Sequence, residues 1–102
     1  MSRFTTYPSV PSLTIEFRLR FDGCHSALER TQRFAPMLRY WGKQSHIAIV
    51  DDTRQCDIEH LNVTVMILGI DTASARRDAD TLLDWVERNL NGWIEDFEIT
   101  AN

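Results

Sequence analysis

The sequence predicts an α+β fold with ferredoxin-like βαββαβ order, in which two helices cover one face of a four-stranded antiparallel sheet. Three patterns predict it: an alternating segment over Leu13–Phe21, a run rich in β-branched residues over Ile58–Ile70, and one segment of helical spacing after each of them. Consecutive β-α-β halves are typical of this fold. Their right-handed crossovers put both helices on the same side of the sheet.

The first strand has the clearest pattern in the chain. Apolar residues occupy every second position of Leu13–Phe21, and between them lie Thr14, Glu16, Arg18 and Arg20. We therefore expect a strand with one buried face and one wet face. Residues 1–12 contain two prolines and show no periodicity, so we expect a flexible tail there, followed by a single domain over residues 13–102.

The first helix begins at a capping box. In the segment 26–29, the Ser26 hydroxyl would accept from the Glu29 N–H, and the Glu29 carboxylate would reach back to the Ser26 N–H. Pro36 lies inside the helix, where it predicts a kink. The residues at helical spacing that predict the buried face are Leu28, Thr31, Ala35, Leu38 and Trp41, with Phe34 beside them.

The segment after the first helix predicts a β-hairpin. Its strands are Ser45–Val50 and Ile58–Ile70, and the acidic, turn-like segment 51–57 joins them. A second helix follows, capped by Asp71 or Thr72. Its apolar stripe comprises Ala75, Ala79, Leu82, Leu83, Val86 and Leu90.

The last strand is predicted over Trp93–Thr100. Alternation places Phe97 and Ile99 on one face together with Trp93. This strand is also acidic, because it contains Glu95, Asp96 and Glu98. In the predicted fold it lies beside the first strand.

Composition excludes several classes of protein. A chain of 102 residues that is 43% hydrophobic forms one domain with a core, and a disordered chain is excluded. No apolar stretch approaches the ~20 residues of a membrane helix. The start of the chain has no apolar core of its own, so we expect no signal peptide. Two cysteines make no disulfide scaffold, and we expect a cytoplasmic protein.

Two segments resemble the YlxP-like family of small bacterial proteins of unknown function. That family enters its first helix with H-S-L-K-E-K-R, and this chain has H-S-A-L-E-R-T over His25–Thr31. The family's N-V-S-V-A-E-V-D resembles Ser45–Asp51, and the order of elements agrees over residues 13–100. The resemblance implies a small bacterial protein without a settled activity. A link to RNA or ribosomes is suspected for the family.

Charge is distributed unevenly along the chain. Residues 1–50 hold seven Lys or Arg against three Asp or Glu, whereas residues 51–102 hold four against twelve. We predict that basic residues of the first half bind RNA, a ribonucleoprotein or an acidic protein surface. The predicted binding residues are Arg18, Arg20, His25, Arg30 and Arg33. The alternative is that acids of the last strand neutralise these arginines within the molecule.

The end of the sheet near the first turn and the hairpin could gather Cys24, His25, Cys56 and His60. Two Cys and two His form a legitimate zinc set. The spacing is poor for zinc, however, and buried thiols beside a polar histidine are the simpler interpretation. We therefore predict no metal and no cofactor.

Histidine beside an acid is the minimum for general acid–base chemistry. His25 could pair with Asp22 or Asp57, and His46 or His60 could pair with Asp51 or Asp52. A small hydrolase or metal site near His25 is the weaker hypothesis that follows. No nucleophile motif accompanies these residues, so we do not predict an enzyme.

The third strand is apolar on both faces. Leu61, Val63, Val65 and Ile67 occupy one face, and Met66, Leu68 and Ile70 occupy the other. A sheet covered on one side would expose the second set. We therefore predict an interface at Met66, Leu68 and Ile70. This favours a homo-oligomer, or a protein–protein or self-assembly module with no role in nucleic-acid binding.

Overall fold

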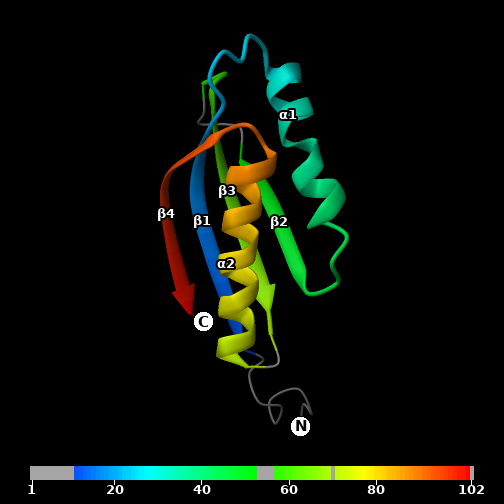
Figure 1. The fold of residues 1–102 in the computed structure, drawn as a ribbon, viewed down its shortest axis with the longest axis vertical. Coiled ribbons are helices and arrows are strands. Elements are labelled where there is room, and N and C mark those ends of the chain that lie inside the picture. The colour runs from blue at the N-terminus through cyan, green and yellow to red at the C-terminus, as the bar shows by residue number, and fades with distance from the viewer. Residues whose placement is uncertain (1–10, 53–56, 70, 102) are drawn as a thin grey trace, which may run out of the picture.

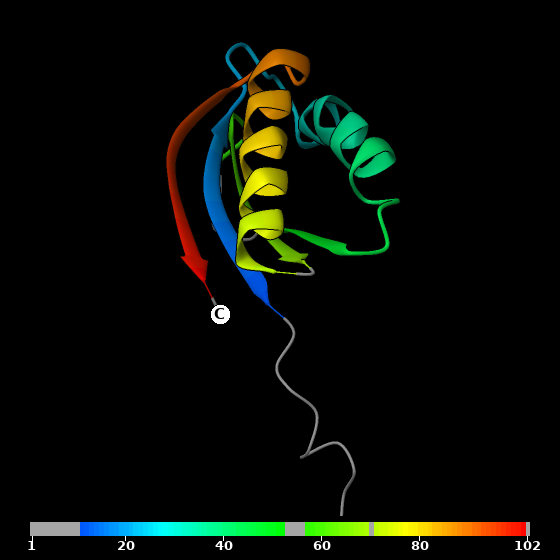
Figure 2. The same ribbon diagram turned by 60° about the horizontal axis from the view of Figure 1, so that its bottom comes forward.

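The six predicted elements form in the predicted order in a computed structural model, which describes residues 11–52, 57–69 and 71–101. They are β1 (Ser12–Arg20), α1 (Ala27–Tyr40), β2 (Ile47–Asp52), β3 (His60–Leu68), α2 (Thr72–Asn89) and β4 (Trp93–Ala101). The strands form one antiparallel sheet in the order β2-β3-β1-β4, and both helices lie on one face of it (Figures 1 and 2). The ferredoxin-like fold is therefore confirmed.

The ends of some elements differ from the predicted ones. The hairpin strand β3 begins at His60 because Asp57 forms a turn before it, in which the Asp57 side chain accepts from the Glu59 N–H at 3.0 Å. Ser12, which falls in the predicted tail, belongs to β1, and the carbonyl of Pro11 accepts from the Gly69 N–H at 3.0 Å. Residues 1–10 of that tail, the centre of the hairpin loop and Ile70 lie outside the described residues.

The core lies between the sheet and the two helices. Alternate residues of β1 and β3 point into it and are buried: Leu13, Ile15, Phe17 and Leu19, with Leu61, Val63, Val65 and Ile67. The predicted stripe of α2 is confirmed, with Ala75, Ala79, Leu82, Val86 and Leu90 buried and Leu83 partly buried. Asp71 caps this helix by accepting from the Ser74 N–H at 2.7 Å.

The buried face of α1 differs from the predicted stripe. Trp41 of the predicted stripe and Phe34 beside it do face the core, together with Met37. Leu28 and Leu38 of that stripe are exposed. Arg30 is the fourth buried residue of this face. Because it is charged, a pattern based on the spacing of apolar residues does not include it. A long Arg stem can pack in a core while its guanidinium reaches polar atoms. The helix runs through Pro36 as one element.

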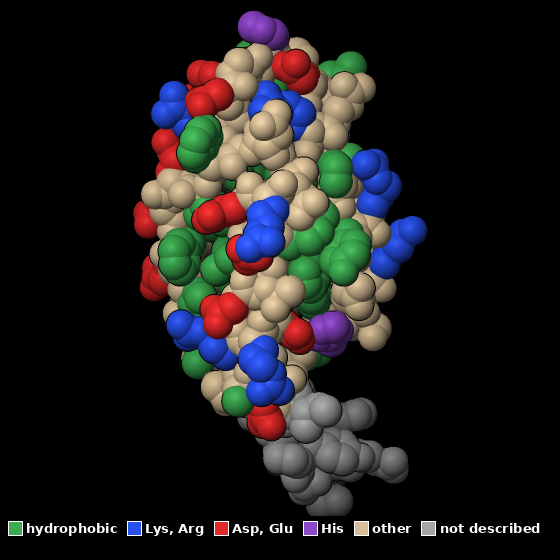
Figure 3. Space-filling view, viewed as in Figure 1, with side chains coloured by type: hydrophobic (Ala, Val, Ile, Leu, Met, Phe, Trp, Pro, Cys, Tyr) green, Lys and Arg blue, Asp and Glu red, His purple; other side chains and the backbone are tan. Residues whose placement is uncertain are grey.

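Aromatic side chains join the two helices. The ring of Tyr40 stacks on Trp85 with centroids 5.3 Å apart and planes 12° apart, and Trp41 meets both rings edge-on. The helix-bearing face shows hydrophobic side chains gathered between α2 and α1 (Figure 3). Contacts of this offset or edge-on kind stabilise the pair of helices beyond the area they bury.

The register of β4 contains an irregularity that sequence alternation does not show. Between Arg18 and Leu19 the pairing shifts, so that Asp96 lies opposite Arg18 and Ile94 lies opposite Leu19. Glu95 is therefore the extra residue of a β-bulge. Because one extra residue reverses the faces beyond it, Phe97 and Ile99 share a face with Ile94. The prediction that they share one with Trp93 is wrong.

Candidate functional site

The face of the sheet without helices is the candidate site, and we call it the open face. Its residues alternate with the buried ones of β1 and β3, and the strand register extends the face to β2 and β4. Five carboxylates and two guanidinium groups lie on it: Glu16, Asp52, Glu95, Asp96 and Glu98 with Arg18 and Arg20. This surface is acidic, whereas the first half of the chain is basic in sequence.

An apolar strip occupies the β2–β3 side of the open face. We use this term for Ala48, Val50, Met66 and Leu68. Ala48 lies directly opposite Met66 in the register. Val50 is 62% exposed, Met66 44% and Leu68 43%. The expected exposure of Met66 and Leu68 is thus observed, while Ile70 lies outside the described residues.

The two predicted arginines of β1 lie on the open face and are engaged by acids. Arg18 Nε lies 3.6 Å from Glu95 Oε1, and Arg20 Nη1 lies 3.7 Å from Glu95 Oε2. Arg20 Nε also lies 2.7 Å from Asp22 Oδ1. The two contacts with Glu95 fit the alternative in which acids of the last strand neutralise these arginines within one molecule, and the contact with Asp22 adds an acid of the first half.

His60 joins the same cluster from β3. Its Nε2 lies 2.9 Å from Glu95 Oε1 and its Nδ1 lies 2.7 Å from Asp57 Oδ1. Carboxylates only accept hydrogen bonds, so both contacts are satisfied together when both ring nitrogens carry hydrogen. The hydrogen bond from the His60 ring holds the pKa of Asp57 below its ordinary value of 3.8.

A row of carboxylates crosses the centre of the open face. Glu16 lies directly opposite Glu98, and Asp96 is two residues away on the same strand. Over the residues that the structure describes, the side-chain carboxylates of these three acids have neither an ion-pair nor a hydrogen-bond partner. A shallow hollow of about 530 Å³ lies here, lined by these acids together with Phe17, Arg18, Asp52, Asn62, Val63, Thr64 and Phe97.

Arg30 and Arg33 are occupied inside the molecule. Arg30 is 6% exposed, and its Nη1 donates to the carbonyls of Asp57 and His60. Arg33 donates from Nη1 to the carbonyl of Asp22 at 2.9 Å and from Nη2 to that of Asn91 at 2.8 Å. Both were predicted to bind a ligand. In the structure, Arg30 ties α1 to the start of β3, and Arg33 ties α1 to two turns.

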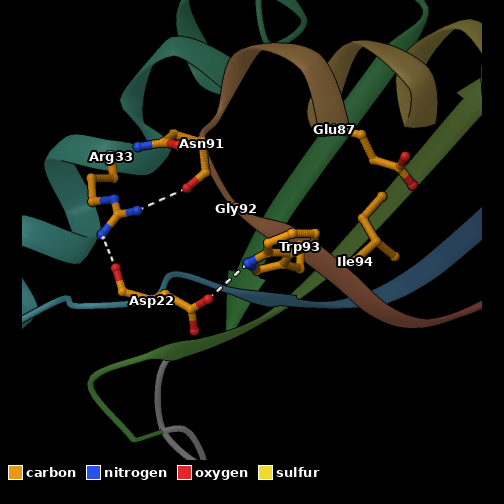
Figure 4. Close-up of a pocket in the computed structure, with 7 residues that line it drawn as sticks. All are labelled: Asp22, Arg33, Glu87, Asn91, Gly92, Trp93 and Ile94. Carbon is orange, nitrogen blue, oxygen red and sulfur yellow. Dashed lines mark hydrogen bonds between the residues drawn. The ribbon is translucent and has the colours of Figure 1, made fainter.

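Arg33 lies at one side of a cleft of about 480 Å³ at the end of the sheet (Figure 4). Trp93 forms another wall, and its indole Nε1 donates to Asp22 Oδ2 at 2.8 Å. Asp22 thus holds the Trp93 ring with one carboxylate oxygen and Arg20 with the other. These contacts lock the turn between β1 and α1 against the start of β4.

His25 lies exposed just before α1. The N–H of Glu29 donates to Ser26 Oγ at 3.0 Å as predicted, but the Glu29 carboxylate accepts from the N–H of His25 at 2.6 Å instead of that of Ser26. This backbone hydrogen bond lowers the pKa of Glu29 below its ordinary value of 4.5. The His25 backbone therefore belongs to a helix cap.

The predicted pairings of histidines with acids do not form. His60 pairs with Asp57 and Glu95, and His46 Nε2 lies 3.1 Å from Asp78 Oδ2 on α2. Cys24 is buried and its thiol donates to the Ser26 carbonyl at 3.4 Å. Cys56 lies outside the described residues. Within the described ranges, no group of three or more His, Cys, Asp or Glu is placed to hold a metal ion.

Sequence reasoning missed the central position of Glu95. Its carboxylate is shared by Arg18, Arg20 and His60, three side chains from two other strands. The sequence feature that could have pointed to this position is that Glu95 is an acid on the strand expected to lie beside β1 and its arginines. The bulge, which turns this acid onto the open face, has no counterpart in the sequence pattern.

Comparisons with known proteins support the class of fold. A scan of protein families and a search of curated proteins find no match. Among solved structures, the chain is similar to the de novo designed protein Foldit4, with 15% identity, a TM-score of 0.53, and coverage of 89% of this chain and 96% of that one.

The chain is also similar to SnoaB, a cofactor-independent oxygenase from Streptomyces nogalater. The identity is 11%, the TM-score is 0.54, and 92% of each chain is covered. Identities this low show the shared ferredoxin-like fold alone. In the part of the chain that the structure describes, no helix is both long and apolar enough to cross a membrane.

Proposed function

We propose that this protein is a protein-interaction module that binds its partner through the open face of the sheet. The observation that supports this proposal is the apolar strip. Val50, Met66 and Leu68 are exposed beside one another on a sheet face that no helix covers. Exposed apolar side chains that are contiguous and rimmed by charges are characteristic of protein interfaces.

The geometry lends less support to RNA binding through the first-half arginines. Arg18 and Arg20 share the carboxylate of Glu95, and the acids around them would repel a phosphate backbone. An accessory role on RNA or the ribosome, which the family resemblance suggested, therefore stays a prediction. It is tested separately below.

The proposal is tested by Met66→Asp, which places a charge in the middle of the apolar strip. Leu28→Asp is the matched control, because Leu28 is an exposed leucine at the start of α1. Proteins retained from a cell extract, and the molecular mass measured by light scattering, are compared for the wild type and both variants. We expect Met66→Asp alone to lose retained partners or to lower the mass. If the two variants behave alike, the proposal is wrong.

A further inference from the structure

The carboxylate row on the open face, formed by Glu16, Asp96 and Glu98, lowers the stability of the free protein by charge repulsion, and no contact among the described residues compensates for it. Glu16 and Glu98 are direct cross-strand neighbours, and like charges in such a pair destabilise a sheet. Asp96 adds a third negative charge on the same strand. The nearby guanidinium of Arg18 lies against Glu95, which is itself shared with Arg20.

A charge arrangement that disfavours the free protein is expected where a partner supplies the opposite charge. We propose that the open face binds a basic and partly apolar segment of another protein. Lys or Arg side chains of this segment meet Glu16, Asp96 and Glu98, and its apolar side chains cover Val50 and Met66. This inference rests on the proposed function, because it specifies the chemistry of the partner at the same face.

The layout of the open face fits such a segment. Cross-strand neighbours lie about 5 Å apart and alternate residues of one strand about 7 Å apart. The three carboxylates are therefore spaced like neighbouring basic side chains on a strand or a helix. Val50 and Thr64 continue the row occupied by Glu16 and Glu98 into the apolar strip. A partner segment that crosses the sheet from β4 to β2 therefore contacts the carboxylates of Glu98 and Glu16 first and the apolar strip at Val50 next.

Other occupants fit the open face less well. A second copy packed on it symmetrically would bring the same carboxylates toward one another. Nucleic acid would bring phosphates to them. Among the described residues no cluster is arranged to hold a metal ion, so a bare cation does not account for the row.

The experiment uses two short labelled peptides, one of alternating lysine and leucine and one of alternating glutamate and leucine, with binding followed by fluorescence anisotropy. The test variant combines Glu16→Gln with Glu98→Gln. The control combines Asp80→Asn with Asp84→Asn, which removes the same charge from the exposed side of α2. We expect the wild type to bind the lysine peptide, and the test variant to bind it about tenfold more weakly.

We expect the control to change affinity by less than about twofold. A second measurement separates binding from structure. The melting temperature of the test variant should rise, because the Glu16–Glu98 repulsion is removed, while its affinity for the lysine peptide falls. A damaged fold would instead lower both the melting temperature and the affinity.

Each remaining outcome has a defined meaning. Equal weakening in the control would show that net charge, and not the open face, attracts the peptide, and would overturn the inference. Loss of binding in Met66→Asp but not in the glutamate variant would overturn the basic partner while the proposed function stands. A dimer that Met66→Asp dissociates, without peptide binding, would assign the face to a second copy. No effect of either variant on any binding would overturn both.

Discussion

The imidazole of His60 on β3 reaches over β1 to Glu95 on β4, with His60 Nε2 2.9 Å from Glu95 Oε1. The two strands are not neighbours, so this contact ties three strands together on the open face. The same carboxylate receives Arg18 and Arg20. Glu95 is therefore the anion around which the charged end of the sheet is organised.

Glu95→Gln should destabilise the protein, because an amide cannot balance the cations around it. The side chain is about one-third exposed, so solvent screening limits the expected loss to about 0.5–1 kcal/mol. Urea unfolding at neutral pH measures it. The matched control is Glu98→Gln on the same strand, which relieves repulsion and should stabilise by a few tenths of a kcal/mol. Changes of the same sign in both variants would contradict this account.

Arg30→Met should cost more than any exposed arginine substitution. It would leave the carbonyls of Asp57 and His60 without the guanidinium that satisfies them, at a cost of about 2 kcal/mol. Arg39→Met, on the exposed last turn of α1, is the control and should stay within about 0.5 kcal/mol. The free energies of unfolding are compared by urea titration. Equal losses of unfolding free energy in the two variants would mean that the buried hydrogen bonds of Arg30 do not contribute to stability.

Strand β1 and helix α2 were predicted closely because their burial follows one local period. The buried face of helix α1 is predicted only in part. Trp41 and its predicted neighbour Phe34 are buried, whereas Leu28 and Leu38 are exposed, because a buried arginine interrupts the apolar stripe that faces the core. The bulge at Glu95 is set by pairing with β1, which a single-strand pattern does not contain. Local periodicity therefore predicts which segments form helices and strands. Where the sequence pattern allows either of two faces of a segment to be buried, tertiary contacts determine which face packs against the core.

The candidate site was predicted in part for the same reason. Alternation alone placed Arg18 and Arg20 on the wet face, and the acids of the last strand were recognised as their neighbours. The contacts of His60 were not predicted, because they depend on a side chain that spans β1. Burial of Arg30 and the hydrogen bonds of Arg33 likewise depend on carbonyl groups far away in sequence.

RNA retention should not depend on the arginines of β1. A variant with Arg18→Gln and Arg20→Gln removes two charges that acids already engage, so we expect the same retention on an RNA column at low salt as for the wild type. A variant with Arg76→Gln and Arg77→Gln removes equal charge from α2 and serves as the control. Loss of retention in the β1 variant alone would support the RNA hypothesis and contradict our assignment of the face.

Acid should weaken the helix cap of α1 through Glu29. The hydrogen bond from the His25 N–H lowers the pKa of Glu29 in the folded protein below the ordinary value of 4.5. A carboxyl with a lowered folded pKa stabilises the protein above its unfolded pKa and loses that contribution as pH falls through the folded pKa.

Glu29→Gln should therefore have a lower urea midpoint than the wild type at pH 7, and the two should converge as the pH falls below the ordinary value of 4.5. Glu87→Gln, an exposed glutamate near the end of α2, is the control and should show no such convergence. The pKa of Asp57 is also lowered, so the stability of every variant falls in acid for that reason. The effect of Glu29 is therefore read from the difference between the wild-type and variant curves of urea midpoint against pH. A constant offset between Glu29→Gln and the wild type at all pH values would show that the carboxylate charge does not support the cap.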